Sequence, residues 1–140
     1  MTSVVATPYA VTDTHALIWA ATGRLARLGR SARRYFKRAD AGGAMIYIPT
    51  LAFVEFGESV RAGRVKLSVP FREWMDALLT KGSFQPYDLT VDVVRAAEGL
   101  YGILERGDRL IAATALVLDC PLITRDPKIA TSAAVELLCG

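Results

Sequence analysis

Short apolar runs alternate along the chain with longer segments whose apolar residues recur at helical spacing. Short runs bounded by Gly, Pro or polar residues are typical of buried strands, and the longer segments are typical of helices. We therefore expect strands at 8–12, 45–49, 83–89, 121–124 and 135–138. We expect helices at 14–21, 30–40, 51–62 and 70–81, after Thr90, and at 107–119.

Several of these helices carry further signals. Thr50 and Thr90 precede two of them and are candidate N-caps, because a threonine hydroxyl can accept a hydrogen bond from the first turn. The segment 107–119 is rich in Ala and apolar nearly all round, so it should be buried between layers. The helix after Thr90 should present one apolar face, formed by Val94, Ala97, Tyr101 and Leu104.

Alternation of strands and helices predicts an α/β fold with a parallel sheet covered on both faces. The chain has 140 residues and shows neither repeats nor a long linker, so residues 1–140 should form a single domain. Apolar residues make up 52% of the chain, which is enough for a sizeable core and leaves some apolar surface for association.

No apolar run is long enough to span a membrane; the longest, Leu110–Leu118, has nine residues and contains Thr114. The N-terminal residues do not resemble a secretory signal, so a cytoplasmic location is expected. His15 is the one histidine, and the two cysteines, Cys120 and Cys139, form no CxxC pair. A Cys/His zinc site is therefore excluded, and we expect buried free thiols and a structural His15.

Positive charge is concentrated in one segment. Residues 24–38 hold seven basic residues and no acid, whereas the rest of the chain holds 10 basic and 14 acidic residues. Such a run is either a solvated helix face or, with Tyr35 and Phe36 inside it, a surface for a nucleic-acid backbone. The candidate nucleic-acid-binding residues are Arg30, Arg33, Arg34, Lys37 and Arg38.

Acidic residues follow predicted strands or begin predicted helices at four places. Asp13 and Asp126 each follow an apolar run and a threonine, Asp108 begins the Ala-rich helix, and Glu55 lies one turn into the helix after 45–49. Ligands of parallel sheets bind beyond the carboxyl ends of the strands. The four carboxylates should therefore lie near one another.

A structural interpretation of these acids stays open. Asp13 and Asp108 can be helix caps or first-turn acids, and Asp126 precedes a proline as turn residues do. Capping does not explain Glu55, which has apolar neighbours on both sides. Other acids are most simply surface charges: Glu58, Glu98, Glu105 and Asp119.

Four carboxylates in one pocket cannot all ionise without a cation, because like charges raise one another's pKa. Oxygen ligands of this kind suit Mg²⁺ or Mn²⁺. A metal ion held there can activate water and stabilise the charge that develops on a phosphodiester. The pattern therefore indicates metal-dependent nuclease chemistry.

The residues around these acids resemble those of PIN-domain ribonucleases, most closely the VapC-type toxins of bacterial toxin–antitoxin pairs. The similar segments occur in the family's order and cover nearly the whole chain: DTHALIWA (13–20), EFGESVRAGRVKL (55–67), GDRLIAATAL (107–116) and LITRDPKI (122–129). The resemblance implies a three-layer α/β/α fold with a central parallel sheet of four or five strands. It also implies an acidic pocket that binds Mg²⁺ or Mn²⁺ and is formed by Asp13, Glu55, Asp108 and Asp126.

In that family pattern Asp13 and Asp108 are the main metal ligands, direct or through water, while Glu55 and Asp126 complete the pocket. The resemblance makes Thr14 and Thr124 candidates for supporting metal-bound water. Arg109 can pair with a pocket carboxylate or a phosphate, although a surface salt bridge explains it equally well. The segment LERG before Asp108 departs from the family, in which a turn with Pro and Asp is common.

Three functions follow from these observations. The first is a metal-dependent endoribonuclease that acts as a toxin, is restrained by an antitoxin protein and forms a homodimer. The second is a PIN-type nuclease in RNA processing or DNA metabolism without an antitoxin. The third is a non-catalytic nucleic-acid or protein-binding module whose acids only cap helices.

Overall fold

Five parallel strands form one sheet in the computed structural model, which describes residues 9–126, 129 and 137–138. The order across the sheet is β3-β2-β1-β4-β5, and all neighbouring strands are parallel, as predicted. The outer parts of the predicted strands 8–12 and 135–138 lie outside the described residues. The strands are β1 (Tyr9–Thr12), β2 (Met45–Pro49), β3 (Phe84–Tyr87), β4 (Leu122–Ile123) and β5 (Leu137–Leu138).

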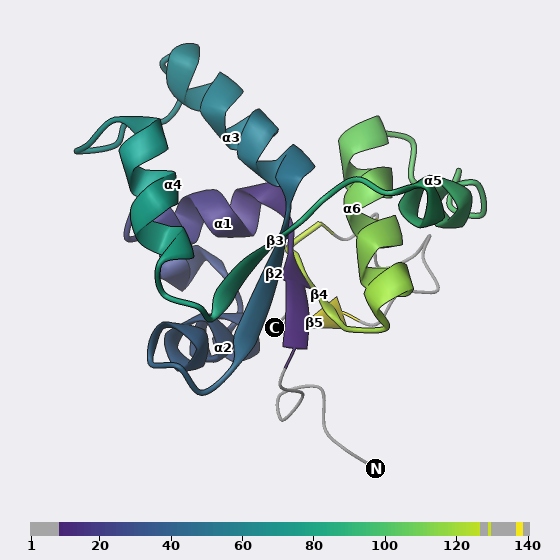
Figure 1. Cartoon of the computed structure of the whole chain (residues 1–140), viewed down its shortest axis with the longest axis horizontal. Helices are drawn as coiled ribbons and strands as arrows, with labels where there is room; N and C mark the ends of the chain where they lie inside the picture. The colour runs from purple at the N-terminus through teal and green to yellow at the C-terminus, as the bar shows by residue number, and fades with distance from the viewer. Residues whose placement is uncertain (1–8, 127–128, 130–136, 139–140) are drawn as a thin grey trace.

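Helices cover both faces of this sheet, which gives the three-layer α/β/α arrangement (Figure 1). Helices α1, α2 and α4 lie on one face and α5 and α6 on the other, while α3 extends from the end of β2 beside α1. A short 3-10 helix, η2 (Leu25–Arg27), was not predicted. The α-helices are α1 (Thr14–Ala21), α2 (Arg30–Asp40), α3 (Thr50–Arg61), α4 (Phe71–Leu79), α5 (Val91–Ala97) and α6 (Arg106–Leu118).

The inner strands are buried on both faces, which explains their uninterrupted apolar sequences. Ala10, Ile46, Ile48 and Leu122 are each fully inaccessible to solvent. Burying an aliphatic side chain of this size contributes about 2 kcal/mol, so the central strands hold the two helical layers together. None of the helices among the described residues is long and apolar enough to cross a membrane.

Helix α6 is buried as the sequence predicted. It packs against β1 on one side and against α5 on the other. Ala112, Ala113 and Ala115 are buried there, and their small side chains permit a close approach to the neighbouring elements. Cys120, just after the helix, is a buried free thiol, as expected, whereas Cys139 lies outside the described residues.

Two predictions about helix ends were wrong in part. Thr90 does cap α5, since its hydroxyl accepts a hydrogen bond from the backbone N–H of Val93 (3.2 Å). The helix ends at Ala97, however, because Gly99 follows, so the expected face does not form: Val94, Tyr101 and Leu104 are exposed. Thr50 is itself the first residue of α3, and its side chain makes no capping hydrogen bond.

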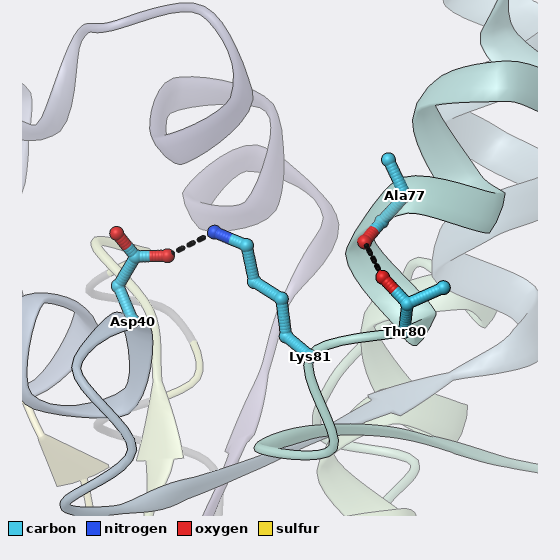
Figure 2. A network of polar contacts seen from close by, with 4 residues as sticks. All are labelled: Asp40, Ala77, Thr80 and Lys81. Carbon is cyan, nitrogen blue, oxygen red and sulfur yellow. Dashed lines mark hydrogen bonds and ion pairs between the residues drawn. The ribbon is translucent and has the colours of Figure 1, made fainter.

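The basic helix α2 is joined to the turn before β3. Lys81 forms an ion pair with Asp40, the last residue of α2, and the Thr80 hydroxyl donates to the carbonyl of Ala77 at the end of α4 (Figure 2). Both charged side chains of the pair are about half exposed, so the pair contributes less than about 1 kcal/mol. The contact nevertheless shows that α2 lies beside the α4–β3 connection.

Candidate active site at the carboxyl edge of the sheet

Asp13 lies directly after β1, where it both caps a helix and faces the other acids. Its Oδ1 accepts a 2.8 Å hydrogen bond from the N–H of Ala16, which makes it the N-cap of α1. The side chain is buried, and this burial raises its pKa, while a hydrogen bond from Thr124 and the bond from Ala16 lower it. Capping and a place in the acidic pocket are therefore compatible roles of one side chain.

The neighbouring strand β4 brings Thr124 and Asp126 to the same edge. The N–H of Asp13 donates to the carbonyl of Ile123 (3.1 Å), which fixes the two strand ends side by side. The buried Thr124 hydroxyl accepts a hydrogen bond from the N–H of Asp126 (3.0 Å). The negative charge of Asp126 raises the pKa of Asp13 in turn, so the strand register places these two acids within electrostatic reach.

Glu55 reaches the same place from α3. The Thr14 hydroxyl donates a 2.5 Å hydrogen bond to its Oε1. Burial raises the pKa of Glu55, the bond from Thr14 lowers it, and the nearby charge of Glu105 raises it again. The carboxylate that capping did not explain is therefore held by a hydroxyl of α1.

Asp108, in the first turn of α6, has the most informative electrostatics of the group. Burial is the main cause that raises its pKa to about 6, and the charges of Glu105, Asp126, Asp13 and Glu55 raise it further, in that order. The four predicted acids therefore influence one another, as their places at strand ends predicted.

An open cleft of about 720 Å³ gives solvent access to part of this cluster. Glu55 and Asp108 line it, whereas Asp13 lies deeper, with 5% of its surface exposed. The exposed imidazole of His15 also lines the cleft, and its ring is 6.2 Å from that of Trp19. We refer to this cleft, lined by Thr14, His15, Glu55, Glu58, Glu105 and Asp108 among others, as the acidic cleft.

Sequence reasoning missed two members of the site. Glu105, predicted to be a surface charge, caps α6: its Oε2 accepts a 2.6 Å hydrogen bond from the N–H of Asp108. Gly107 is buried beneath Glu55, and a Cβ atom there would stand 2.2 Å from Oε2 of that glutamate. A Glu directly before an Ala-rich helix was the available signal for the first, but nothing local marked the second.

Arg109 forms no ion pair with a carboxylate among the described residues, and its pairing with a phosphate stays a prediction. Its guanidinium lies 4.1 Å from the centroid of the Tyr101 ring and donates to the carbonyls of Ile103 and Leu104. It therefore fastens the loop between α5 and α6, within the part of the chain that the structure describes.

The basic helix α2 is not brought to the acidic cleft. Among the described residues that line the cleft, the cations are Arg61 and Arg64 from the end of α3 and the turn after it. Tyr35 and Phe36 point inward and are buried in the core. Nucleic-acid binding stays a prediction for the set of α2 residues: Arg30, Arg33, Arg34, Lys37 and Arg38.

The donor chemistry of the site fits a hard divalent cation. The oxygen atoms that the site offers belong to carboxylates and hydroxyls, and burial raises the pKa of Asp13, Glu55 and Asp108. Within the described residues no three acidic, histidine or cysteine side chains are placed to hold one ion together. Mg²⁺ keeps several waters and commonly uses only one or two carboxylates, and its binding by Asp13, Glu55, Asp108 and Asp126 stays a prediction.

Comparisons with known proteins agree with this architecture. The sequence model of a PIN domain matches residues 10–134. No curated protein sequence matches the chain. The fold resembles VapBC2 from Rickettsia felis, solved with a DNA fragment from its promoter, at a TM-score of 0.69 and 16% identity, covering 92% of this chain and 96% of that one.

Two further solved structures share the fold. A toxin–antitoxin complex from Klebsiella pneumoniae matches with a TM-score of 0.58 and 20% identity, covering 90% of this chain and 94% of that one. FitAcB from Neisseria gonorrhoeae matches with a TM-score of 0.58 and 16% identity, covering 92% and 96%. At these identities the likeness extends to the fold alone.

Proposed function

The chain belongs to the PIN domain family, and from this premise we propose that it is a metal-dependent endoribonuclease serving as the toxin of a toxin–antitoxin pair. The observation that supports the proposal is the electrostatic proximity of Asp13, Glu55, Asp108 and Asp126: the charges of the other three raise the pKa of Asp108, and Asp126 also raises that of Asp13. A protein that used these acids only as caps would gain nothing from placing them together, because their mutual repulsion destabilises the fold.

The site is assigned Mg²⁺ or Mn²⁺, held by Asp13 and Asp108 directly or through water, with Glu55 and Asp126 completing the pocket. When bound, such an ion supplies a Lewis acid that lowers the pKa of coordinated water and offsets charge on a phosphodiester. The chain's own residues supply the geometry. Asp13 is fixed by Ala16 and Thr124, so its carboxylate is oriented before any ligand arrives.

Glu55 is suited to position or deprotonate the attacking water. Thr14 occupies its Oε1, and Oε2 accepts no hydrogen bond from another described residue. The free oxygen is therefore the atom that takes a proton. The raised pKa of this carboxyl brings it closer to that of a general base working near neutral pH.

The toxin role rests on resemblance. Solved structures with this fold include toxin–antitoxin complexes, and we propose a cognate antitoxin for this chain as well. A homodimer is proposed because large apolar side chains lie exposed on and around α5, including Leu89, Val91, Val94, Tyr101 and Leu104. The proposed setting is the cytoplasm, where RNA is available.

The test is cleavage of a structured RNA mixture by purified protein with Mg²⁺, with Mn²⁺ or with EDTA, beside an Asp13→Asn control. We expect cutting that requires the metal and is lost in the control. Equal cutting by the parent and the control would show that the Asp13 carboxylate is not needed for the reaction. Metal binding without cutting of any RNA, measured by calorimetry, would contradict the ribonuclease assignment.

The toxin role needs a separate experiment. Expression of the parent without a partner should arrest growth, and Asp13→Asn should relieve the arrest. An active nuclease whose expression is harmless would favour a role in RNA processing without an antitoxin.

A further inference from the structure

A second groove adjoins the acidic cleft and has the opposite charge. It has a volume of about 710 Å³ and shares His15, Ile18, Ser59 and Arg64 with the acidic cleft. Arg24 and Lys66 also line it, and its lining among the described residues includes no acid. We refer to this surface, with Trp19 on its wall, as the basic groove.

The cations of the basic groove are available to a ligand. Arg24, Arg64 and Lys66 are exposed. None of them forms an ion pair with another residue in the described ranges, where the ion pairs are Lys81–Asp40 and Arg95–Asp92. These cations form no ion pair with the acids of the neighbouring cleft, so neutralisation of those acids does not explain them.

Two helix ends of the same kind place the two arginines. Gly23 lies two residues after the last residue of α1 and has a positive φ of 72°, and the N–H of Arg24 donates to the carbonyl of Trp19 (2.7 Å). Gly63 lies two residues after the last residue of α3 and has a φ of 78°, and the N–H of Arg64 donates to the carbonyl of Ser59 (3.0 Å). Both ends have the 6→1 hydrogen bond of a Schellman motif, and the end of α3 also has the 5→2 bond from the N–H of Gly63 to the carbonyl of Val60 (3.1 Å). These bonds fix the backbone of the residue after each glycine.

An aromatic pair, His15 and Trp19, lines the basic groove. The ring centroids of His15 and Trp19 are 6.2 Å apart, with 48° between the ring planes. His15 lines both cavities, whereas Trp19 lines the basic groove alone. Proteins that bind single-stranded nucleic acids combine aromatic rings with nearby cations, because unstacked bases pack on the rings while the phosphates contact the cations.

We propose that the basic groove binds the single-stranded RNA segment that leads to the acidic cleft, with Arg24, Arg64 and Lys66 contacting its phosphates. The assignment of RNA rests on the proposed function. The acidic cleft repels phosphates on its own, so a substrate strand needs cations next to it. Arg64 belongs to both cavities and so lies where the strand passes from one to the other.

The proposal is tested by fluorescence anisotropy with a labelled, mixed-sequence single-stranded RNA in EDTA, a condition that needs no cleavage. The variant is Arg24→Gln/Arg64→Gln. The matched control is Arg72→Gln/Arg95→Gln, which removes the same charge from exposed positions outside both cavities. Thermal unfolding should show that both variants are folded.

We expect the groove variant to bind about tenfold more weakly and its salt dependence to fall by about 1.4 in log–log slope, since each phosphate contact to a single strand contributes about 0.7. The control should bind like the parent. Arg24→Lys/Arg64→Lys keeps the charges and should retain most of the affinity. Lys66→Gln changes one exposed residue and should weaken binding about threefold. This variant replaces the double variant in the test if the double variant does not fold.

Two results would overturn the proposal: no binding of RNA by the parent, or equal losses in the groove variant and the control. These outcomes are distinct from failure of the proposed function. A parent that binds through the groove yet never cleaves RNA disproves the nuclease alone, and a parent that cleaves with an affinity insensitive to Arg24 and Arg64 disproves the groove alone.

Discussion

The hydroxyl of Thr14 donates a 2.5 Å hydrogen bond to Oε1 of Glu55, and so links the first residue of α1 to α3. Thr14 is buried and follows Asp13, the cap of the same helix. The bond lowers the pKa of Glu55 against the effect of burial. One turn of helix therefore orients two of the carboxylates of the site.

Thr14→Val removes this bond while keeping the shape of the side chain. The pKa of Glu55 should then rise further, and cleavage near neutral pH should fall about tenfold, since a hydrogen bond to a charged group contributes about 1.5–3 kcal/mol. The acidic limb of the pH–rate profile should move to higher pH. Thr14→Ser restores the hydroxyl and should restore the profile; an unshifted limb in Thr14→Val would refute the role of this bond.

Asp13 has a structural and a chemical role that two substitutions separate. Asn caps helices as well as Asp does, whereas Ala at an N-cap costs about 1 kcal/mol. Both Asp13→Asn and Asp13→Ala should lower cleavage by about hundredfold or more. In urea denaturation in EDTA, the free energy of unfolding of Asp13→Ala should be lower than that of Asp13→Asn by about 1 kcal/mol. Equal stability of the two variants would mean that the bond to Ala16 contributes little.

Asp108 makes the metal-free protein sensitive to pH. Its pKa is about 6 in the folded chain against 3.8 for an ordinary aspartate, so the folded state holds a proton that the unfolded state has lost. The free energy of unfolding should therefore fall as pH rises from the ordinary pKa of 3.8 to the folded pKa of about 6, and it should fall no further from this cause at higher pH.

Asp108→Asn provides the comparison for this effect. Urea unfolding in EDTA at about pH 4, 5 and 7 should show the variant gaining stability over the parent as pH rises. Added Mg²⁺ should stabilise the parent more than the variant. If the difference in unfolding free energy between variant and parent became smaller with rising pH, the raised pKa would not belong to Asp108.

Gly107→Ala should separate activity from stability. An added Cβ would stand 2.2 Å from Oε2 of Glu55, which is the far end of a flexible side chain and can move away. Helix propensity favours Ala by up to about 1 kcal/mol, but the added Cβ would also stand 3.1 Å from Oε2 of Glu105, which caps the helix. The two effects oppose each other, so the stability of the variant should stay within about 1 kcal/mol of that of the parent. Cleavage should fall by about hundredfold as the carboxylate is displaced.

Gly99→Ala is the matched control for that change, because a Cβ at Gly99 meets only the carbonyl oxygen of Ala96, at an ordinary 3.7 Å. Its cleavage rate should equal that of the parent. If Gly107→Ala is also fully active, close packing of Glu55 on α6 is not required for the reaction.

The sequence predicted the part of the site that depends on strand direction. Asp13 and Asp126 each follow a strand, and parallel strands end at one edge, so their proximity followed from the pattern alone. Glu105 was predicted to be a surface charge, although its capping bond to the N–H of Asp108 is local. Gly107 was missed because its role depends on how α3 packs against α6, which no local spacing reveals. The same holds for Arg109, whose partners belong to the irregular loop before α6.

The basic segment shows a further limit of sequence reasoning. The high density of positive charge predicted a nucleic-acid-binding surface within residues 24–38. Charge density does not, however, indicate on which side of the sheet a helix lies. The cations beside the cleft include Arg24 and Arg64, which follow glycines at the ends of two different helices. In α5, helical spacing continued past Gly99 in the sequence, although the helix itself did not.

The pairing of β1 with β4 also determines when the acidic cleft can form during synthesis. Val11 of β1 pairs with Leu122 of β4, so this pairing cannot form until nearly all of the described chain has been synthesised. Translation proceeds at about 5–20 residues per second, and Asp13 therefore spends several seconds in a nascent chain that lacks Thr124 and Asp126. A chain still attached to the ribosome through this region therefore has an incomplete carboxylate cluster, and the cluster can form only when synthesis of the described chain is nearly complete.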